Sequence, residues 1–222
     1  MSQLGGVPVI ILKEGTESTK GKGARNKNIQ AIRAVAEAVK TTLGPRGMDK
    51  MLVDSLGDVT ITNDGATILD KLDVDHPGAK MAVEIAKNQD DQVGDGTTSA
   101  VIVASQLLNV ADELMEQGIH PNTVGKGFRK AMKKALEVID TIAKDTENDP
   151  EILKQCARTT MNSKGIAGKR EFFANIAVDV MLKVYEEGQT SYESVKNVVV
   201  LKKKGKSLKE TEIISGIVLE KE

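Results

Sequence analysis

The residues best suited to binding a charged ligand lie in the hexapeptide GDGTTS at positions 94–99. The segment that follows, 100–118, carries apolar residues at the three-and-four spacing of one buried face, which predicts a helix. The hexapeptide then lies at a helix N-terminus, where N–H groups lack partners within the helix and the helix dipole is positive. Gly94 and Gly96 let the backbone turn tightly and approach a ligand closely. We therefore expect an anion here, and specifically a phosphate.

The carboxylate within this loop, Asp95, indicates a metal ion as well. A carboxylate alone repels phosphate, but Mg²⁺ binds carboxylate and phosphate oxygens together. The other interpretation is a plain turn in which Thr97 or Thr98 caps the helix. The sequence contains no G-x-x-x-x-G-K-[ST] motif, and it lacks the third glycine of a dinucleotide fingerprint and the distal Glu of a calcium loop.

Two further residues are candidates for the same site. Asp64 follows Thr62 and Asn63 in a strong turn signal and is suited to capping a short helix over 66–72. Alternatively, its carboxylate faces the same anion, where it would hold a metal ion or orient a water molecule for attack. Lys164, in the loop 162–165, is a solvated cation unless the fold brings it to the phosphate.

The composition argues against several classes of function. Lys and Arg number 31 against 32 acidic residues, and aromatic residues make up 2% of the 222, so neither charge nor stacking indicates nucleic-acid binding. The single cysteine, Cys156, cannot form an internal disulfide, and two histidines do not suggest a histidine metal site. No apolar run reaches membrane-spanning length. We therefore expect a cytoplasmic protein without nucleic-acid or membrane partners.

Helices are expected to position the candidate residues. Besides 100–118, the apolar spacing predicts helices at 26–43, 66–72, 78–92, 120–144, 151–161 and 169–187. The segment 13–24, rich in Gly, Thr and Lys, is expected to be a loop. Residues expected to face the core include Ile29, Ile32, Ala36, Val39, Leu43, Met81, Ala82, Ile85, Phe128, Ala131, Met132, Ala135, Ile139 and Ile142.

Short strands are expected at three places. Residues 51–53 and 59–61 predict a hairpin, which is marginal alone and needs another surface, for example on a different chain. Residues 7–12 predict an edge strand, and 195–201 with 213–219 predict a second hairpin. The fold class is therefore mainly α with small β elements (α+β). A polar, proline-containing stretch predicts a boundary between domains 1–144 and 145–222.

Several motifs occur together in a characteristic order and spacing. They are TTLGPRGMDKMLV at 41–53, TNDGATIL at 62–69, His76-Pro77, and GDGTTSAV at 94–101. With them the sequence resembles the N-terminal part of group II chaperonin subunits, the family of the thermosome and its eukaryotic cytosolic relatives. The likeness runs from residue 4 to residue 222 and is thinner after 145.

This resemblance implies a helical equatorial-like half-domain over 1–144, which binds ATP or ADP with Mg²⁺, and part of an intermediate domain over 145–222. It implies that Asp95 is the magnesium ligand and that Asp64 is a catalytic carboxylate near the γ-phosphate and its attacking water. The 51–61 hairpin and the N-terminal strand resemble the segments that join a neighbouring chaperonin subunit. The nucleotide-binding residues implied by the resemblance are Leu43, Gly44, Gly96, Thr97, Thr98, Ser99, Ser163 and Lys164.

The chain also departs from the family pattern. Family chains are far longer, and by this resemblance the apical domain, a second catalytic aspartate and the other equatorial half are not included here. Two functions are therefore expected. One is a chaperonin-type ATP-binding subunit that assists protein folding, with unfolded client proteins as partners only if an apical domain is supplied elsewhere. The alternative is a truncated paralogue or fragment without its own ATPase activity, which binds nucleotide weakly or associates with full-length subunits.

Overall fold

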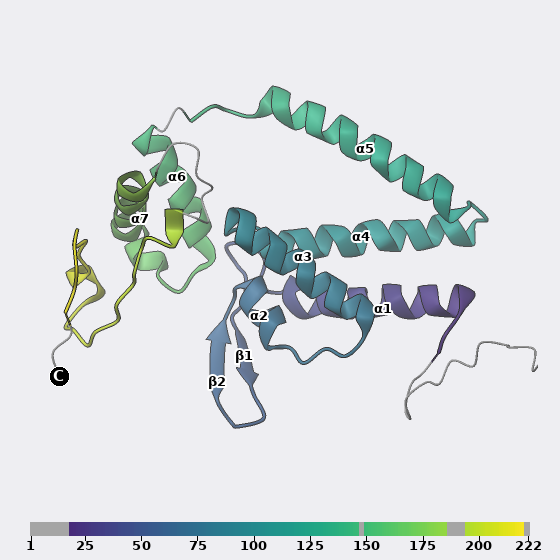
Figure 1. The fold of residues 1–222 in the computed structure, drawn as a ribbon, viewed down its shortest axis with the longest axis horizontal. Coiled ribbons are helices and arrows are strands. Elements are labelled where there is room, and N and C mark those ends of the chain that lie inside the picture. Colours follow the sequence, from purple (N-terminus) through teal and green to yellow (C-terminus); the bar gives the residue numbers. More distant parts are fainter. Residues whose placement is uncertain (1–17, 147–148, 186–193, 220–222) are drawn as a thin grey trace, which may run out of the picture.

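The computed structural model describes residues 18–146, 149–185 and 194–219, and its elements are mainly helical (Figure 1). This confirms the expected fold class, mainly α with a small β element. The helices and strands are α1 (Gly21–Lys40), β1 (Lys50–Val53), β2 (Val59–Thr62), α2 (Gly65–Lys71), α3 (Pro77–Val93), α4 (Thr97–Glu116), α5 (Pro121–Ile142), α6 (Pro150–Thr160) and α7 (Arg170–Val184). Three short 3-10 turns, η1 (Met161–Ser163), η2 (Ala167–Lys169) and η3 (Leu208–Glu210), complete the described elements.

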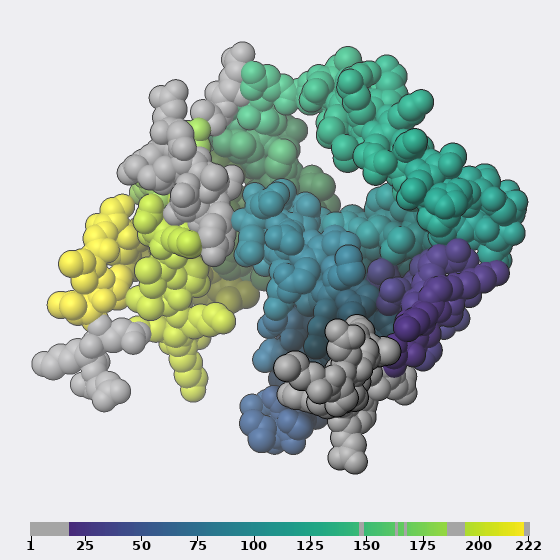
Figure 2. Space-filling view, turned by 45° about the vertical axis from the view of Figure 1, so that its right-hand side comes forward, coloured from purple at the N-terminus to yellow at the C-terminus, as the bar shows by residue number. Residues whose placement is uncertain are grey.

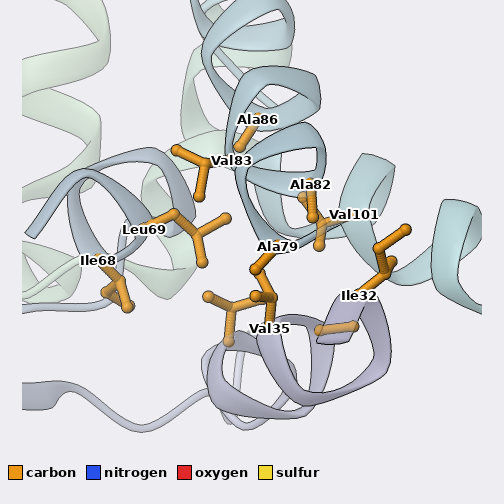
Figure 3. Close-up of a cluster of buried hydrophobic side chains, with 11 residues drawn as sticks. Ile32, Val35, Ile68, Leu69, Ala79, Ala82, Val83, Ala86 and Val101 are labelled. Carbon is orange, nitrogen blue, oxygen red and sulfur yellow. The ribbon is translucent and has the colours of Figure 1, made fainter. Parts of the chain in front are cut away.

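The core lies where α1, α3 and α4 pack against one another and against α2 (Figures 1 and 3). It consists of aliphatic side chains with many alanines, which let the helices approach closely. Burial of one large side chain such as Ile68 or Leu69 contributes about 2 kcal/mol. The cluster comprises Ile32, Val35, Ala36, Val39, Ile68, Leu69, Ala79, Ala82, Val83, Ala86 and Val101.

Side chains cap the beginnings of several helices. The Nδ1 atoms of His76 and His120 accept hydrogen bonds from the N–H groups of Gly78 (3.1 Å) and Asn122 (3.2 Å). A proline follows each histidine, where its missing N–H costs nothing. Both histidines therefore have structural roles at helix N-termini.

The first helix differs from its expected bounds at both ends. Residues 21–24 were expected in a loop but are helical, and the helix ends at Lys40 instead of residue 43. The hydroxyl of Thr42 donates to the carbonyl oxygen of Val39 at 2.7 Å, which closes the last turn. Leu43 therefore lies beyond the helix and is 48% exposed, so its expected place in the core is wrong.

Several residues expected to face the core on α3 and α5 are exposed, although Ala82 on α3 is fully buried as expected. Met81 on α3 is 65% exposed, and Ile142 on α5 is 69% exposed. In α5 the one buried residue is Val124, although the helix is strongly amphipathic. Figure 2 shows an opening between α5 and the α3–α4 body. The spacing correctly indicated an apolar face, but spacing alone does not show whether anything covers that face.

The hairpin of β1 and β2 confirms the strands expected at 51–53 and 59–61. The strands are antiparallel, with Lys50 opposite Thr62 and Val53 opposite Val59. Asp54 Oδ1 accepts the N–H groups of two turn residues at 2.9 Å, which holds the turn closed. The hairpin projects from the helical body (Figure 1).

The two strands expected at 195–201 and 213–219 are not formed within the described range 194–219. A strand needs hydrogen-bond partners, and a segment rich in Val, Ile and Leu does not by itself supply them. The strand expected at 7–12 lies outside the described residues. The domain boundary at 145 stays a prediction, although α6 packs on α7 beyond it. No described helix is both long and apolar enough to cross a membrane.

Candidate functional site

One cavity of about 360 Å³ lies where the loop after α1, the starts of α2 and α4, and the end of α6 meet. Its lining includes every site residue expected from the sequence except Ser163, whose side chain lies outside the described part of the structure. The lining residues are Thr42, Leu43, Gly44, Pro45, Asn63, Asp64, Gly65, Asp95, Gly96, Thr97, Thr98, Ser99, Thr159, Thr160, Asn162 and Lys164.

The start of α4 forms one wall of the cavity. Gly94 and Gly96 adopt positive φ values of 72° and 78°, and Gly96 is the N-cap residue. Within the described structure α4 has no side-chain cap, so the cap expected from Thr97 or Thr98 is not formed. The helices α1 and α7 also lack a side-chain cap, but their first residues do not line this cavity. The N–H groups of the first turn of α4 therefore remain available to an anion.

The start of α2 packs directly against the start of α4. A Cβ atom at Gly65 would lie 2.9 Å from the backbone nitrogen of Thr98 and 3.0 Å from the hydroxyl oxygen of Thr97. Such distances are too short for a side chain, so the approach depends on glycine. The turn signal at 62–65 gave no indication of this packing role.

The loop after α1 closes the cavity on another side. Met48 N–H donates to the Thr41 carbonyl oxygen and Gly47 N–H to that of Gly44, both at 2.9 Å. Gly44 has a φ of 82°, a value that favours glycine. The loop thereby holds Leu43 and Gly44 at the cavity, and their expected contact with nucleotide stays a prediction.

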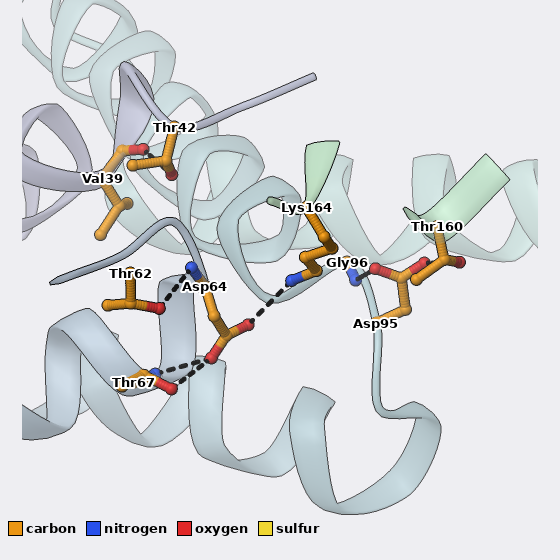
Figure 4. Close-up of polar contacts among 9 residues, drawn as sticks. All are labelled: Val39, Thr42, Thr62, Asp64, Thr67, Asp95, Gly96, Thr160 and Lys164. Atoms are coloured by element: carbon orange, nitrogen blue, oxygen red, sulfur yellow. Dashed lines mark hydrogen bonds and ion pairs between the residues drawn. The ribbon is translucent and has the colours of Figure 1, made fainter. Parts of the chain in front are cut away.

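Asp95 takes part in three hydrogen bonds around its loop, and Figure 4 shows the two that its carboxylate accepts. Its Oδ1 accepts the N–H of Gly96 at 2.8 Å, and its Oδ2 accepts the hydroxyl of Thr160 at 2.8 Å. The side chain of Gln89 donates to the Asp95 carbonyl oxygen at 2.8 Å. Each carboxylate oxygen has two lone pairs, so both oxygens retain capacity to bind a cation.

Asp64 caps α2, as one of the two sequence interpretations expected, and it also lines the cavity. Its Oδ2 accepts both the N–H and the hydroxyl of Thr67 at 2.8 Å, which caps α2. Its Oδ1 lies 3.8 Å from Lys164 Nζ and lines the cavity (Figure 4). The fold therefore brings Lys164, distant in sequence, to the same site as Asp64.

The local charges are unbalanced toward the negative. Partial removal from water, together with the nearby carboxylates of Asp64 and Asp91, raises the pKa of Asp90 above its ordinary value of 3.8, while Lys164 opposes the shift. The described residues contain no group of three or more His, Cys, Asp or Glu arranged to hold a metal ion. A metal ion at Asp95 would therefore need ligand atoms from a bound molecule or from water.

Replacing Asp90 by asparagine is expected to raise the melting temperature at pH 7. A raised pKa in the folded state means that the charged carboxylate destabilises the fold at neutral pH. The protonated Asp90 side chain is favoured in the folded state. The stability that this contributes is complete below pH 3.8 and is lost as the pH rises through the folded-state pKa. The gain in melting temperature over the unaltered chain should therefore shrink as the pH falls from 7 toward 4. Asp73→Asn is the control, because Asp73 is exposed and is not among the charges that shift the pKa of Asp90, and an equal rise there would assign the effect to net charge.

Sequence reasoning missed several lining residues. Thr160 lies 65 positions from Asp95 and belongs to no motif, so no sequence signal indicated it. Thr42 and Asn63 lie within the motifs at 41–53 and 62–69, and proximity to Gly44 and Asp64 would have sufficed to include them.

This chain is similar in sequence to known chaperonin proteins, both to a family model and to individual relatives. Residues 35–222 match the TCP-1/cpn60 chaperonin family. The chain is 52% identical to thermosome subunit beta of Thermococcus kodakarensis over 224 residues, covering 100% of this chain and 41% of that protein. It is 53% identical to thermosome subunit beta of Sulfurisphaera tokodaii over 219 residues, covering 98% and 40%, and 51% identical to that of Aeropyrum pernix over 224 residues, covering 100% and 41%. The chain thus spans about two fifths of the length of these relatives.

Proposed function

Because this chain belongs to the TCP-1/cpn60 chaperonin family, we propose that it is the part of a chaperonin subunit that binds the phosphates of ATP or ADP with Mg²⁺. One observation carries the proposal. The uncapped start of α4 with the neighbouring Asp95 carboxylate, the carboxylate of Asp64, and the ammonium of Lys164 converge on one cavity from three separate segments. Each group alone has a structural explanation, but their convergence suits a polyphosphate.

The proposed phosphate contacts come mainly from the backbone. The N–H groups and hydroxyls of Thr97, Thr98 and Ser99 donate to phosphate oxygens, and the dipole of α4 adds positive potential. The glycines flanking Asp95 let the phosphates approach the main chain. The loop at Leu43 and Gly44 encloses the phosphates from the opposite side.

The residues present fit a magnesium ion. Asp95 would hold it, since its carboxylate lines the cavity and retains lone pairs on both oxygens. The ion, when bound, neutralises charge between that carboxylate and the phosphates. A single protein carboxylate is sufficient, because Mg²⁺ takes most of its ligands from phosphate oxygens and water.

The proposed catalytic contribution comes from Asp64. Its Oδ1 is the carboxylate oxygen not used in capping α2, and it accepts a hydrogen bond from a water molecule in the cavity, orienting that water toward the γ-phosphate. The capping bonds fix the carboxylate, so the water would be held in one position. If Asp64 alone does not suffice for hydrolysis, the chain binds nucleotide without turning it over, which is the alternative function.

The β1–β2 hairpin supports association with other chaperonin subunits. It exposes an apolar row comprising Met51, Val53, Val59 and Ile61 on a two-stranded sheet that is marginal alone. We propose that a neighbouring subunit adds strands to this sheet. The N-terminal segment of this chain is proposed to contribute to the same association. Binding of unfolded clients, and a cytoplasmic location, are proposed for the assembled chaperonin.

Replacing Lys164 by methionine is expected to weaken ATP binding about 10-fold while leaving ADP binding nearly unchanged. The ammonium group lies beside Asp64 Oδ1, where the γ-phosphate is proposed to lie, and one charge-assisted contact is worth about 1.5 kcal/mol. Equilibrium titration of the full chain with ATP and with ADP, in the presence of Mg²⁺, measures the change in affinity for each nucleotide. The folded state should be little affected, because the ion pair with Asp64 is partly solvent-exposed.

Lys169→Met is the matched control, since Lys169 follows Lys164 closely in the sequence but does not line the cavity. Equal losses of ATP and ADP affinity on Lys164→Met would contradict a γ-phosphate contact. No Mg²⁺-dependent binding of either nucleotide by the unaltered chain would overturn the proposed function. ATP turnover measured on the same samples distinguishes the hydrolytic function from the alternative.

A further inference from the structure

We propose that Thr160 is a positioning residue for Mg²⁺, acting through its hydrogen bond to Asp95. The inference rests on the proposed nucleotide function and adds the last residue of α6 to the groups that determine Mg²⁺ binding. It assigns to the end of α6 an indirect influence on metal affinity, exerted through the Asp95 carboxylate.

The contact joins two distant parts of the chain. Thr160 Oγ1 donates to Asp95 Oδ2 at 2.8 Å across 65 positions of sequence, and both residues line the same cavity (Figure 4). Among the described residues, this is the one hydrogen bond that the Asp95 carboxylate accepts from another element. The other bond, from Gly96 N–H, comes from the adjacent residue in the same loop.

The carboxylate needs such a contact because its own loop constrains it weakly. Asp95 is exposed and lies between two glycines with positive φ, so neighbouring side chains do not fix its rotamer. A hydroxyl that donates to Oδ2 restricts the rotation of the carboxylate and leaves the remaining lone pairs to the cavity. Hydrogen bonds to a metal-ligating carboxylate typically change metal affinity by about 10- to 100-fold.

The position of the donor is itself fixed. Thr160 is the last residue of α6, and α6 packs on α7. An ion pair between Arg158 Nη2 and Glu171 Oε1, 2.6 Å apart, links the two helices two residues before Thr160. The hydroxyl is therefore presented to Asp95 by a packed helix end and not by a loose loop.

The adjacent Thr159 provides a matched comparison. It also lines the cavity, but its hydroxyl donates to the Gln155 carbonyl oxygen at 2.9 Å, within its own helix. The two threonines thus share residue type, helix and cavity, and differ in which acceptor the hydroxyl reaches. A Thr→Val change at either position removes the hydroxyl and keeps the branched shape.

The test measures the Mg²⁺ concentration that half-saturates ADP binding to the full chain. Thr160→Val is expected to raise this concentration about 10-fold, and Thr160→Ser, which restores a hydroxyl, should return it close to the original value. Thr159→Val should leave it unchanged. ADP affinity in EDTA should be the same in all four proteins, because the hydroxyl acts through the metal ligand.

An unchanged or lowered half-saturating concentration in Thr160→Val would overturn the inference, and a lowered one would mean that the hydroxyl competes with the metal ion. Loss of ADP affinity in EDTA would also overturn it, by indicating a general structural role. If Thr160→Val does not fold, Thr160→Ala carries the same expectations. Failure of the unaltered chain to bind ADP with Mg²⁺ would instead overturn the proposed function, so the two failures are distinguishable.

Discussion

Replacing Asp95 by alanine is expected to abolish the enhancement of ATP binding by Mg²⁺, lowering affinity in Mg²⁺ about 100-fold. A metal ion held between a carboxylate and phosphates stabilises that charge by several kcal/mol, and about 3 kcal/mol corresponds to this factor. In EDTA, Asp95→Ala should no longer weaken ATP binding. The carboxylate lines the cavity and repels metal-free phosphate, so its removal should leave metal-free ATP binding unchanged or slightly stronger. Titration with ATP in Mg²⁺ and in EDTA measures both effects.

Asp73→Ala is the control for net charge, because Asp73 is exposed and does not line the cavity. The Asp95 variant should fold normally, since the residue is exposed and its loop conformation depends on the flanking glycines. Retention of a full Mg²⁺ enhancement by Asp95→Ala would show that the metal ion is held elsewhere. The plain-turn interpretation of the loop would then be correct.

Replacing Gly65 by alanine is expected to destabilise the fold by about 2 kcal/mol and to weaken nucleotide binding at least about 10-fold. The added Cβ would lie 2.9 Å from the backbone nitrogen of Thr98 and 3.0 Å from the Thr97 hydroxyl. The starts of α2 and α4 must then separate, and overpacking of this kind typically costs about 1–3 kcal/mol. Denaturant unfolding and ADP titration measure the two losses.

Helix propensity alone predicts the opposite sign, because alanine is favoured over glycine by up to about 1 kcal/mol within a helix. Gly127→Ala in α5 tests helix propensity separately, since a Cβ added there would meet no atom within 4 Å apart from its chain neighbours and its own helix backbone. Gly127→Ala should therefore stabilise the chain while Gly65→Ala destabilises it. Stabilisation by both would contradict the close approach of the two helices.

Local signals predicted much of the site. The Gly94–Gly96 region is a tight turn before a helix because its glycines adopt positive φ, and Asp64 caps α2 as the Asn-Asp-Gly sequence indicated. Both features involve groups within a few residues of each other. The nucleotide and metal roles of these residues stay predictions, since they concern a bound ligand.

Long-range features were predicted less well. The strands expected at 195–201 and 213–219 have no pairing partners in the described structure, and the apolar face of α5 is largely exposed. In each case the sequence pattern describes the segment, whereas the outcome depends on what lies beside it. Exposure of Met81 on α3 has the same cause.

The sequence by itself determined the helical class, the hairpin at 51–61, the turn before α4 and the family to which the chain belongs. Those features depend on spacing, on backbone preferences of glycine and proline, and on contiguous motifs. Only the tertiary structure brought Lys164 to Asp64 and Thr160 to Asp95, and only it made Gly65 a point of contact between two helix starts. These contacts depend on how the helices pack, because packing sets distances between residues that are far apart in the chain.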